Sequence, residues 1–203
     1  QYLTREAANP SSIMSCLIQA RNNARAVRSA LSIDVWEAIN GAYLDARQFT
    51  EATYALDNFP VFIDWVKRQA LVFNGAYSNT MLRTDSFYFL RLGTFLERAD
   101  NTARILDVKY YVLLPSPFHV GSSLDNVQWE TILRSVSAQR AYRWQNPGQV
   151  DPMGIAEFLI LDPRMPRSLA FCYRKIDDNL GYLAADYGQH HHCHELSHNL
   201  RLR

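Results

Sequence analysis

The chain has 203 residues, and its 21 Lys and Arg against 20 Asp and Glu leave a formal net charge of +1. This balance gives no bulk electrostatic attraction for nucleic acid or for an anionic membrane surface, so we expect neither as a partner. Hydrophobic residues make up 48% of the chain, which is enough for a sizeable core, and no apolar run approaches the roughly 20 residues of a membrane span. The three cysteines (Cys16, Cys172 and Cys193) are odd in number and far apart. That pattern is typical of a reducing compartment, so we expect a cytoplasmic protein.

Apolar residues recur at helical spacing along most of the chain, and no stretch of strict alternation competes with that pattern. Prolines and small polar residues divide it, with Pro10 and Pro166 expected in the first turns of their helices. We predict an all-α bundle of about seven or eight helices with mostly short connections. The expected helices cover residues 10–31, 33–47, 58–82, 86–114, 123–144, 152–161 and 166–187, followed by a last helical segment after Gly188.

The chain starts without an initiator Met or a signal-peptide pattern, and it still has a helical pattern where it stops. We therefore expect one helical domain over residues 1–203, cut from a longer chain. A short internal repeat also appears, because residues 10–16 and 166–172 share Pro, Ser, an aliphatic residue and Cys at matching positions. Duplication of a helical unit explains this similarity, and so does chance resemblance between two helix starts.

The longest helical pattern, over residues 87–111, has two contrasting faces. One face is apolar and is expected to be buried: Tyr88, Leu92, Phe95, Ala99, Ala103, Leu106 and Tyr110. The other is polar, and it supplies our candidate binding residues, with Arg98 on its flank: Glu97, Arg98, Asp100, Asn101 and Arg104.

Two interpretations of this polar face stay open. It is either a solvated face with ion pairs such as Asp100–Arg104, or a partly buried face whose charges need partners on other helices. Gly93 favours the second interpretation, because glycine is costly inside a helix unless another element approaches closely. The arginines of the first helix (Arg21, Arg25 and Arg28) are then candidate partners.

A His-rich tail is the second candidate site. His194-Glu195-Leu-Ser-His198 fits the His-Glu-x-x-His spacing, which on a helix places two imidazoles one turn apart for zinc and a Glu beside the bound water. Five of the six histidines lie in this tail, so a chance match is easy, and no third ligand follows. We therefore predict no metal site and no cofactor. The chain also lacks a phosphate-binding glycine loop and a nucleophile elbow, so we predict no catalytic residue.

The segment Leu92-Gly-Thr-Phe-Leu-Glu-Arg-Ala-Asp-Asn-Thr-Ala-Arg-Ile-Leu106 resembles the bacterial alpha-E domain family, an all-helical family named for a Glu-Arg motif, here Glu97-Arg98. Further similar segments are spread over most of the chain: 9–13, 20–25, 35–40 and 162–168. Members of this family are typically encoded beside, or fused to, a circularly permuted ATP-grasp ligase, and often near transglutaminase-like peptidases. The resemblance therefore implies a role in forming or processing amide bonds on peptides.

Three functions follow from these observations. The first is a non-catalytic helical partner of an ATP-grasp-type ligase, which docks the ligase or holds a peptide or amino-acid ligand through arginine–carboxylate pairs. The second is an acid/base enzyme of the same pathway that uses Glu97 or Asp100. The third is a metal-binding or metallopeptidase-like protein that uses His194, Glu195 and His198.

Overall fold

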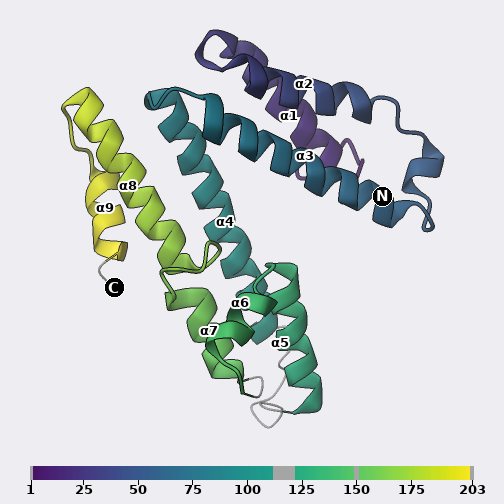
Figure 1. Cartoon of the computed structure of the whole chain (residues 1–203), viewed down its shortest axis with the longest axis vertical. Helices are drawn as coiled ribbons and strands as arrows, with labels where there is room; N and C mark the ends of the chain where they lie inside the picture. Colours follow the sequence, from purple (N-terminus) through teal and green to yellow (C-terminus); the bar gives the residue numbers. More distant parts are fainter. Residues whose placement is uncertain (1, 112–121, 149–150, 202–203) are drawn as a thin grey trace. The chain divides into compact units, whose positions relative to one another are not determined.

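The computed structural model describes residues 2–111, 122–148 and 151–201. The chain divides into two compact units, residues 1–87 (unit 1) and residues 88–203 (unit 2), and each is considered by itself (Figure 1). The described residues form nine α-helices and two short 3-10 helices, with no strand among them. The prediction of an all-α protein with about seven or eight helices is therefore confirmed. Across these same residues, no helix is both long enough and apolar enough to cross a membrane.

Unit 1 is built from three helices: α1 (Ile13–Ala26), α2 (Ile33–Ala46) and α3 (Phe59–Thr80). The 3-10 helices η1 (Arg28–Ala30) and η2 (Glu51–Tyr54) lie in the two connections. Helix α2 packs against both α1 and α3. Val35 of α2 and Phe62 of α3 are almost completely buried in its core, and the ring of Phe49 meets those of Phe62 and Trp65 edge to face.

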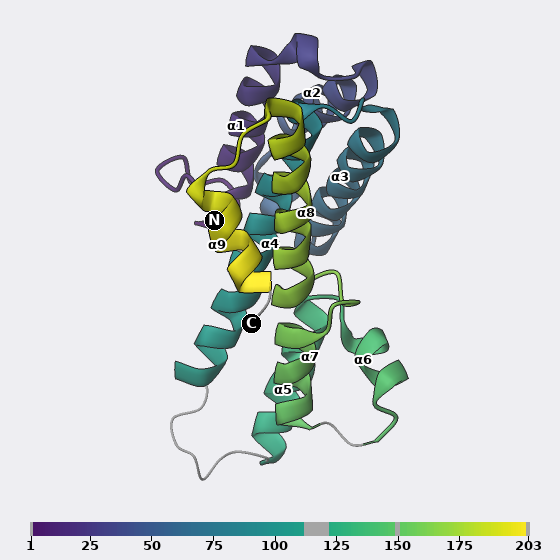
Figure 2. The same ribbon diagram turned by 90° about the vertical axis from the view of Figure 1, so that its left-hand side faces the viewer.

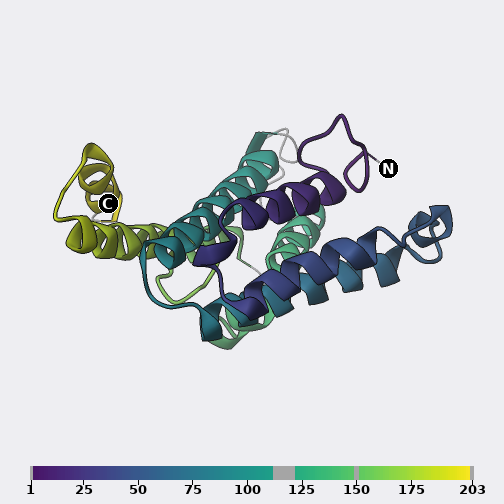
Figure 3. The ribbon, with the colours of Figure 1, turned by 90° about the horizontal axis from the view of Figure 1, so that it is seen from above.

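Unit 2 contains most of α4 (Asp85–Tyr111), whose first residues fall in unit 1, and all of the five helices that follow. These are α5 (Ser123–Ser135), α6 (Gln139–Gln145), α7 (Pro152–Leu161), α8 (Leu169–Tyr187) and α9 (His192–Arg201). Gly188 ends α8 in the left-handed conformation (φ 65°), and α9 turns back beside α8 (Figures 2 and 3). The predicted end of the long helix, at residue 114, falls within residues 112–121, outside the described residues.

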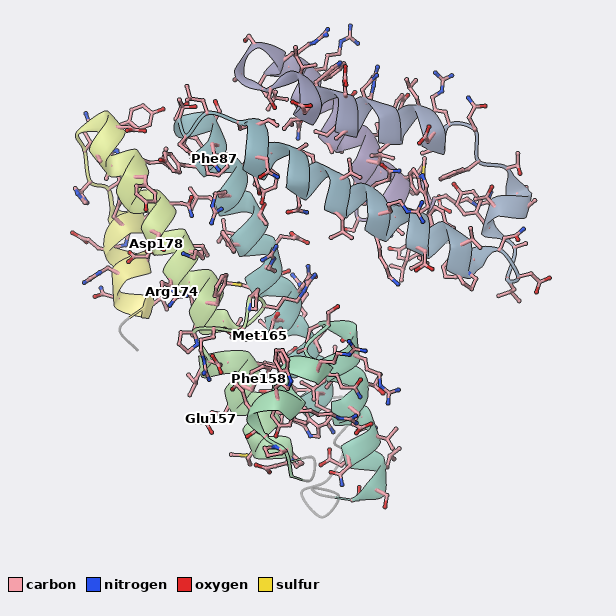
Figure 4. The ribbon with its side chains drawn as sticks, viewed as in Figure 1. Phe87, Glu157, Phe158, Met165, Arg174 and Asp178 are labelled. Atoms are coloured by element: carbon pink, nitrogen blue, oxygen red, sulfur yellow. The ribbon has the colours of Figure 1, made fainter. Side chains whose placement is uncertain are left out.

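Helix α4 contributes to both hydrophobic clusters of unit 2. Its first half packs against α8, with which it runs side by side in Figures 1 and 2. Its last turns join α5, α6 and α7 in the second cluster, which also includes Phe158 and Met165 (Figure 4). The cluster shared with α8 contains Leu92, Phe95, Ala99, Cys172, Ile176 and Leu183. Helix α4 is thus the element around which unit 2 is organised.

The single helix predicted over residues 123–144 is wrong, because the chain breaks between α5 and α6. Ser137 adopts a left-handed conformation with φ 57°. The Ala138 N–H then bonds the Leu133 carbonyl at 2.7 Å, and the Ser137 N–H bonds the Arg134 carbonyl at 3.0 Å. These two bonds are those of a Schellman motif, which satisfies the last carbonyls of α5 and lets the chain restart as α6.

The predicted starts of α1 and α8 are also wrong, each by about one turn, and the two errors have a common cause. Pro10 and Pro166 lie in turns that precede α1 and α8, instead of inside their first turns. Ser12 and Ser168 are the N-caps: both have extended backbone, and their hydroxyl oxygens accept hydrogen bonds from the N–H groups three residues further on. A serine cap fixes the start more strongly than the preference of proline for a first turn.

Candidate functional site

The buried stripe of α4 is turned slightly from the predicted one. Leu92, Phe95, Ala99 and Leu106 are buried as expected, but Ala103 and Tyr110 are exposed. Two polar side chains take their place in the buried stripe, Thr102 and Lys109. The prediction was wrong for these positions because it ranked residues by polarity, whereas each of the two polar groups has a partner inside the unit.

The polar side chains of the predicted face pair with one another along α4. Arg104 Nε lies 2.6 Å from Asp100 Oδ2, and this carboxylate raises the pKa of the Arg104 guanidinium. Asn101 Nδ2 donates weakly to Glu97 Oε1 at 3.4 Å. All four side chains are exposed. Within the described part of unit 2, a Cβ atom at Gly93 would meet no atom within 4 Å beyond its own stretch of α4, so this glycine does not mark a close approach in that unit.

Arg98, on the flank of that face, reaches across to the turn before α8. Its Nη1 donates to the Pro166 carbonyl at 3.3 Å, and one turn further along α4 the Thr102 hydroxyl donates to the Arg167 carbonyl at 2.8 Å. The Arg98 guanidinium also lies over the ring of Phe95, 5.3 Å from its centroid. Arg98 and Thr102 therefore fasten the start of α8 onto α4.

This arrangement brings a second arginine, Arg167, close to Arg98, and we call the two the arginine pair. Burial lowers the pKa of the Arg167 guanidinium, and the positive charge of Arg98 lowers it further. No carboxylate of the described residues forms an ion pair with either guanidinium, in contrast to Arg104. Cys172 lies near both; burial raises the pKa of its thiol more than the two positive charges lower it, and this disfavours the reactive thiolate form.

Arg167 was absent from the residues predicted from the sequence. Arg167 lies in the family-like segment 162–168, but only the docking of α8 on α4 places it beside Arg98.

The arginines of the first helix, which were candidate partners of the polar face, have contacts within unit 1. Arg21 Nε donates to Asn40 Oδ1 at 3.0 Å, and the Arg28 guanidinium lies 4.7 Å from the Trp36 ring centroid. Their pairing with the polar face of α4 stays a prediction.

The His-Glu-x-x-His spacing falls on α9, but its side chains have separate partners. His194 Nε2 lies 3.2 Å from the Leu180 carbonyl, and His198 Nδ1 lies 4.0 Å from Asp177 Oδ2. Glu195 lies 3.5 Å from His192. Within the described ranges, no three His, Cys, Asp or Glu side chains are grouped as metal ligands. The tail therefore offers no assembled zinc site of the type the spacing suggests.

A hollow of about 410 Å³ lies between the start of α4, the end of α8 and the start of α9. Its wall is mostly apolar, and Cys193 Sγ in that wall lies 3.6 Å from His194 Nδ1. The hollow is lined by Phe89, Leu180, Leu183, Tyr187, Cys193 and His194, among others. None of the predicted binding residues of α4 lines it, so the arginine pair and this hollow are separate features.

Taken together, the fold and these contacts define an all-helical domain whose central helix places an arginine without an acidic partner beside a second one. The model of the Alpha-E family, described as a predicted alpha-helical domain with a conserved ER motif, matches residues 1–203. The chain therefore belongs to the Alpha-E family, as its resemblance indicated. Glu97-Arg98 is the only Glu-Arg dipeptide in the sequence, so it is the pair that fits this description. No curated protein and no solved structure matches the chain.

Proposed function

We propose that this chain is a non-catalytic helical partner of an ATP-grasp-type peptide or amide ligase in the bacterial cytoplasm, and that it holds a carboxylate of the peptide or amino-acid substrate. The arginine pair carries this proposal. The part that concerns the ligase rests on the gene context that the family resemblance implies.

The chemistry of the arginine pair supports a carboxylate ligand. Two guanidinium groups close together repel each other, and the repulsion is relieved when an anion binds between them. Arg98 uses only part of its donor set on the Pro166 carbonyl, because a guanidinium carries five N–H donors. Arg167 is free to turn its own donors to the same ligand, and bidentate pairing of guanidinium with carboxylate is among the stronger charged contacts in proteins.

The neighbouring polar face supports the choice of a peptide over a simple anion. Glu97, Asp100 and Asn101 are exposed on the same helix as Arg98, and they offer acceptors for the amine or amide N–H groups of a bound peptide. A ligand with a carboxylate and nearby N–H donors therefore suits the surface better than phosphate does. Glu97 and Asp100 are exposed, and Asp100 is paired with Arg104; no observation favours the acid/base or metallopeptidase functions, which stay predictions.

The partnership is tested with the purified chain and the ATP-grasp ligase encoded beside it. Binding is measured by biolayer interferometry, and ADP release is measured with the amino-acid or peptide substrate of that ligase. We expect a complex and a faster ADP release with the chain than without it. If the ligase is fully active alone and does not bind the chain, the partnership is refuted.

The role of the arginine pair is separated from docking by two matched substitutions. Arg167→Ala removes the arginine without an ion-pair partner, whereas Arg104→Ala removes an arginine that already has its carboxylate. Loss of a charged, bidentate contact costs about 1.5–3 kcal/mol, so Arg167→Ala is expected to raise the substrate KM at least tenfold and Arg104→Ala to leave it within about twofold. Equal effects of the two substitutions would show that the arginine pair does not hold the substrate.

A further inference from the structure

The loop between α7 and α8 is held by two arginines that come from different helices. Arg98 of α4 donates through Nη1 to the Pro166 carbonyl at 3.3 Å. Arg174 of α8, labelled in Figure 4, donates through Nη2 to the Pro163 carbonyl at 2.8 Å. Two carbonyls three residues apart are separated by at most about 11 Å, so both guanidinium groups lie at the same short loop.

Two aromatic rings connect Arg174 to the arginine pair. The rings of Phe95 on α4 and Phe171 on α8 meet with their centroids 6.0 Å apart. The guanidinium carbon of Arg98 lies 5.3 Å from the centroid of Phe95, and that of Arg174 lies 5.4 Å from the centroid of Phe171. The two arginines therefore flank one ring contact, and Arg174 extends the arginine pair across the α4–α8 interface.

Arg174 shares a second property with the arginine pair, because it has no acidic partner within the part of unit 2 that the structure describes. Neighbouring cations do have one. Lys175 Nζ lies 3.0 Å from Asp178 Oδ2, and Arg164 Nη2 lies 3.0 Å from Asp162 Oδ2. Three guanidinium groups without a counter-charge thus lie around one loop, and we call them the arginine cluster: Arg98, Arg167 and Arg174.

The charge of the arginine cluster exceeds what a single carboxylate can compensate. A carboxylate held between Arg98 and Arg167 supplies one negative charge, and Arg174 is left without a counter-charge. Like charges at one loop repel each other, and a second anionic group on the ligand relieves that repulsion. Arg174 uses one N–H group on the Pro163 carbonyl, so it keeps further donors for such a group.

The arrangement of the arginine cluster favours two separate carboxylates over one compact dianion. The arginines approach the loop from two helices, whereas phosphate presents its charge at one centre. A peptide that ends in an acidic residue carries an α-carboxylate and a side-chain carboxylate only a few bonds apart, which matches the short loop. Each carboxylate is planar and accepts the paired N–H donors of a guanidinium group.

We propose that the arginine cluster binds a peptide whose C-terminal residue is acidic. Arg98 and Arg167 hold the α-carboxylate, and Arg174 holds the carboxylate of the last side chain. This inference rests on the proposed function, because it adds a second contact to the same site and thereby names the class of the substrate. Arg174 is then the residue that selects an acidic C-terminus over a neutral one.

The selection is tested with two peptides and the full wild-type chain. The probe is N-acetyl-Ala-Ala-Glu with a free C-terminal carboxylate. The control is N-acetyl-Ala-Ala-Gln, which has the same size and the same α-carboxylate but a neutral side chain. Binding is followed by NMR chemical shifts at one fixed ionic strength, because salt screens charged contacts. We expect the Glu peptide to bind at least about tenfold more tightly than the Gln peptide.

A matched pair of substitutions on α8 assigns the preference to Arg174. Arg174→Gln removes the charge and keeps an amide donor for the Pro163 carbonyl. Lys175→Gln removes a charge that lies 5.8 Å from the centroid of the same Phe171 ring but is already paired with Asp178. We expect Arg174→Gln to bring the two affinities within about twofold by weakening only the Glu peptide, and Lys175→Gln to keep most of the preference. Circular dichroism checks that both variants are folded.

The outcomes separate this inference from the proposed function. If the wild-type chain binds the Glu and Gln peptides equally, the inference is overturned and the proposed function stands, because the Gln peptide still has its α-carboxylate. If neither peptide binds, both are overturned.

Two further results would overturn the inference alone. The first is an equal loss of preference in Arg174→Gln and Lys175→Gln, which would show that the overall charge of the surface decides it. The second is inorganic phosphate that displaces the Gln peptide as effectively as the Glu peptide does, which would show that the cluster binds a simple anion. We expect phosphate to compete at least about tenfold less well than the Glu peptide.

Discussion

Lys109 and Asp125 form an ion pair inside unit 2, and removal of one charge is expected to destabilise the fold strongly. The Lys109 ammonium donates to Asp125 Oδ1, and also to Gln128 Oε1 at 2.9 Å. The two charged side chains are 0% and 2% exposed. The ammonium also lies 5.4 Å from the centroid of the Trp129 ring. Because bulk solvent does not reach this lysine, Asp125 supplies the counter-charge that compensates for its burial.

The substitution Asp125→Asn keeps the size of the side chain and removes its charge. Breaking a buried pair in this way costs about 3–5 kcal/mol, since the remaining charge stays buried without its counter-charge. For a unit of this size, that corresponds to a fall in Tm of roughly 10–20 °C. The control is Asp100→Asn, whose pair with Arg104 has side chains 51% and 75% exposed. Exposed pairs contribute at most about 1 kcal/mol.

A double substitution separates the charge from the packing. Lys109→Met combined with Asp125→Leu removes both charges and fills similar space, so its cost is expected to be smaller than that of Asp125→Asn alone. The free energy of unfolding is measured with urea, by circular dichroism and by tryptophan fluorescence. Trp129 is 3% exposed and lies beside the pair, so it reports on this region. A cost of Asp125→Asn no larger than that of Asp100→Asn would contradict the strong effect of the buried pair, and so would a double variant as unstable as the single one.

Three smaller effects follow from the helix ends and from one ion pair. Ser168→Ala loses its cap bond and its bond to the Asp162 carbonyl, so it should cost about 1–2 kcal/mol in urea unfolding, and Ser12→Ala about 1 kcal/mol. Ser137→Gly relieves a left-handed residue and should raise the unfolding free energy by up to about 1 kcal/mol. The Arg164 hydrogen bond lowers the pKa of Asp162. Its stabilisation is therefore present above the ordinary Asp pKa of about 3.9 and lost as pH falls through the lower folded-state value, so Arg164→Ala should lose less stability than wild type over that interval. Equal losses of unfolding free energy in wild type and Arg164→Ala on acidification would contradict this.

The helical architecture was predictable because its signals are local. Apolar residues at three- and four-residue steps place the helices, and α4 emerged from its own pattern as the longest and most two-faced of them. The two polar residues of the buried stripe of α4 were not predictable in that way. Lys109 has the sequence character of a surface residue, and only the packing of α5 brings Asp125 against it. Periodicity measures polarity, whereas burial depends on whether a polar group finds a partner.

The candidate site was predictable only in part, as was the buried stripe of α4. Arg98 belonged to the predicted binding residues because it lies in the family-like segment on α4. Arg167 did not, since it joins Arg98 only after α8 docks through contacts to backbone carbonyls, which sequence patterns do not record. The repeat of residues 10–16 and 166–172, by contrast, was visible in the sequence. In the structure both copies place a serine at the N-cap of a helix and a cysteine sulfur near a proline carbonyl.

The central claim is that the arginine pair holds a substrate carboxylate, and a titration of the chain with a minimal peptide tests it most directly. The probe is N-acetyl-trialanine with a free C-terminal carboxylate, and the control is its C-terminal amide, with binding followed by NMR chemical shifts. We expect the acid to bind at least about tenfold more tightly than the amide, and we expect Arg167→Ala to remove this preference whereas Arg104→Ala keeps it. Equal affinities of the acid and the amide for the wild-type chain would contradict it.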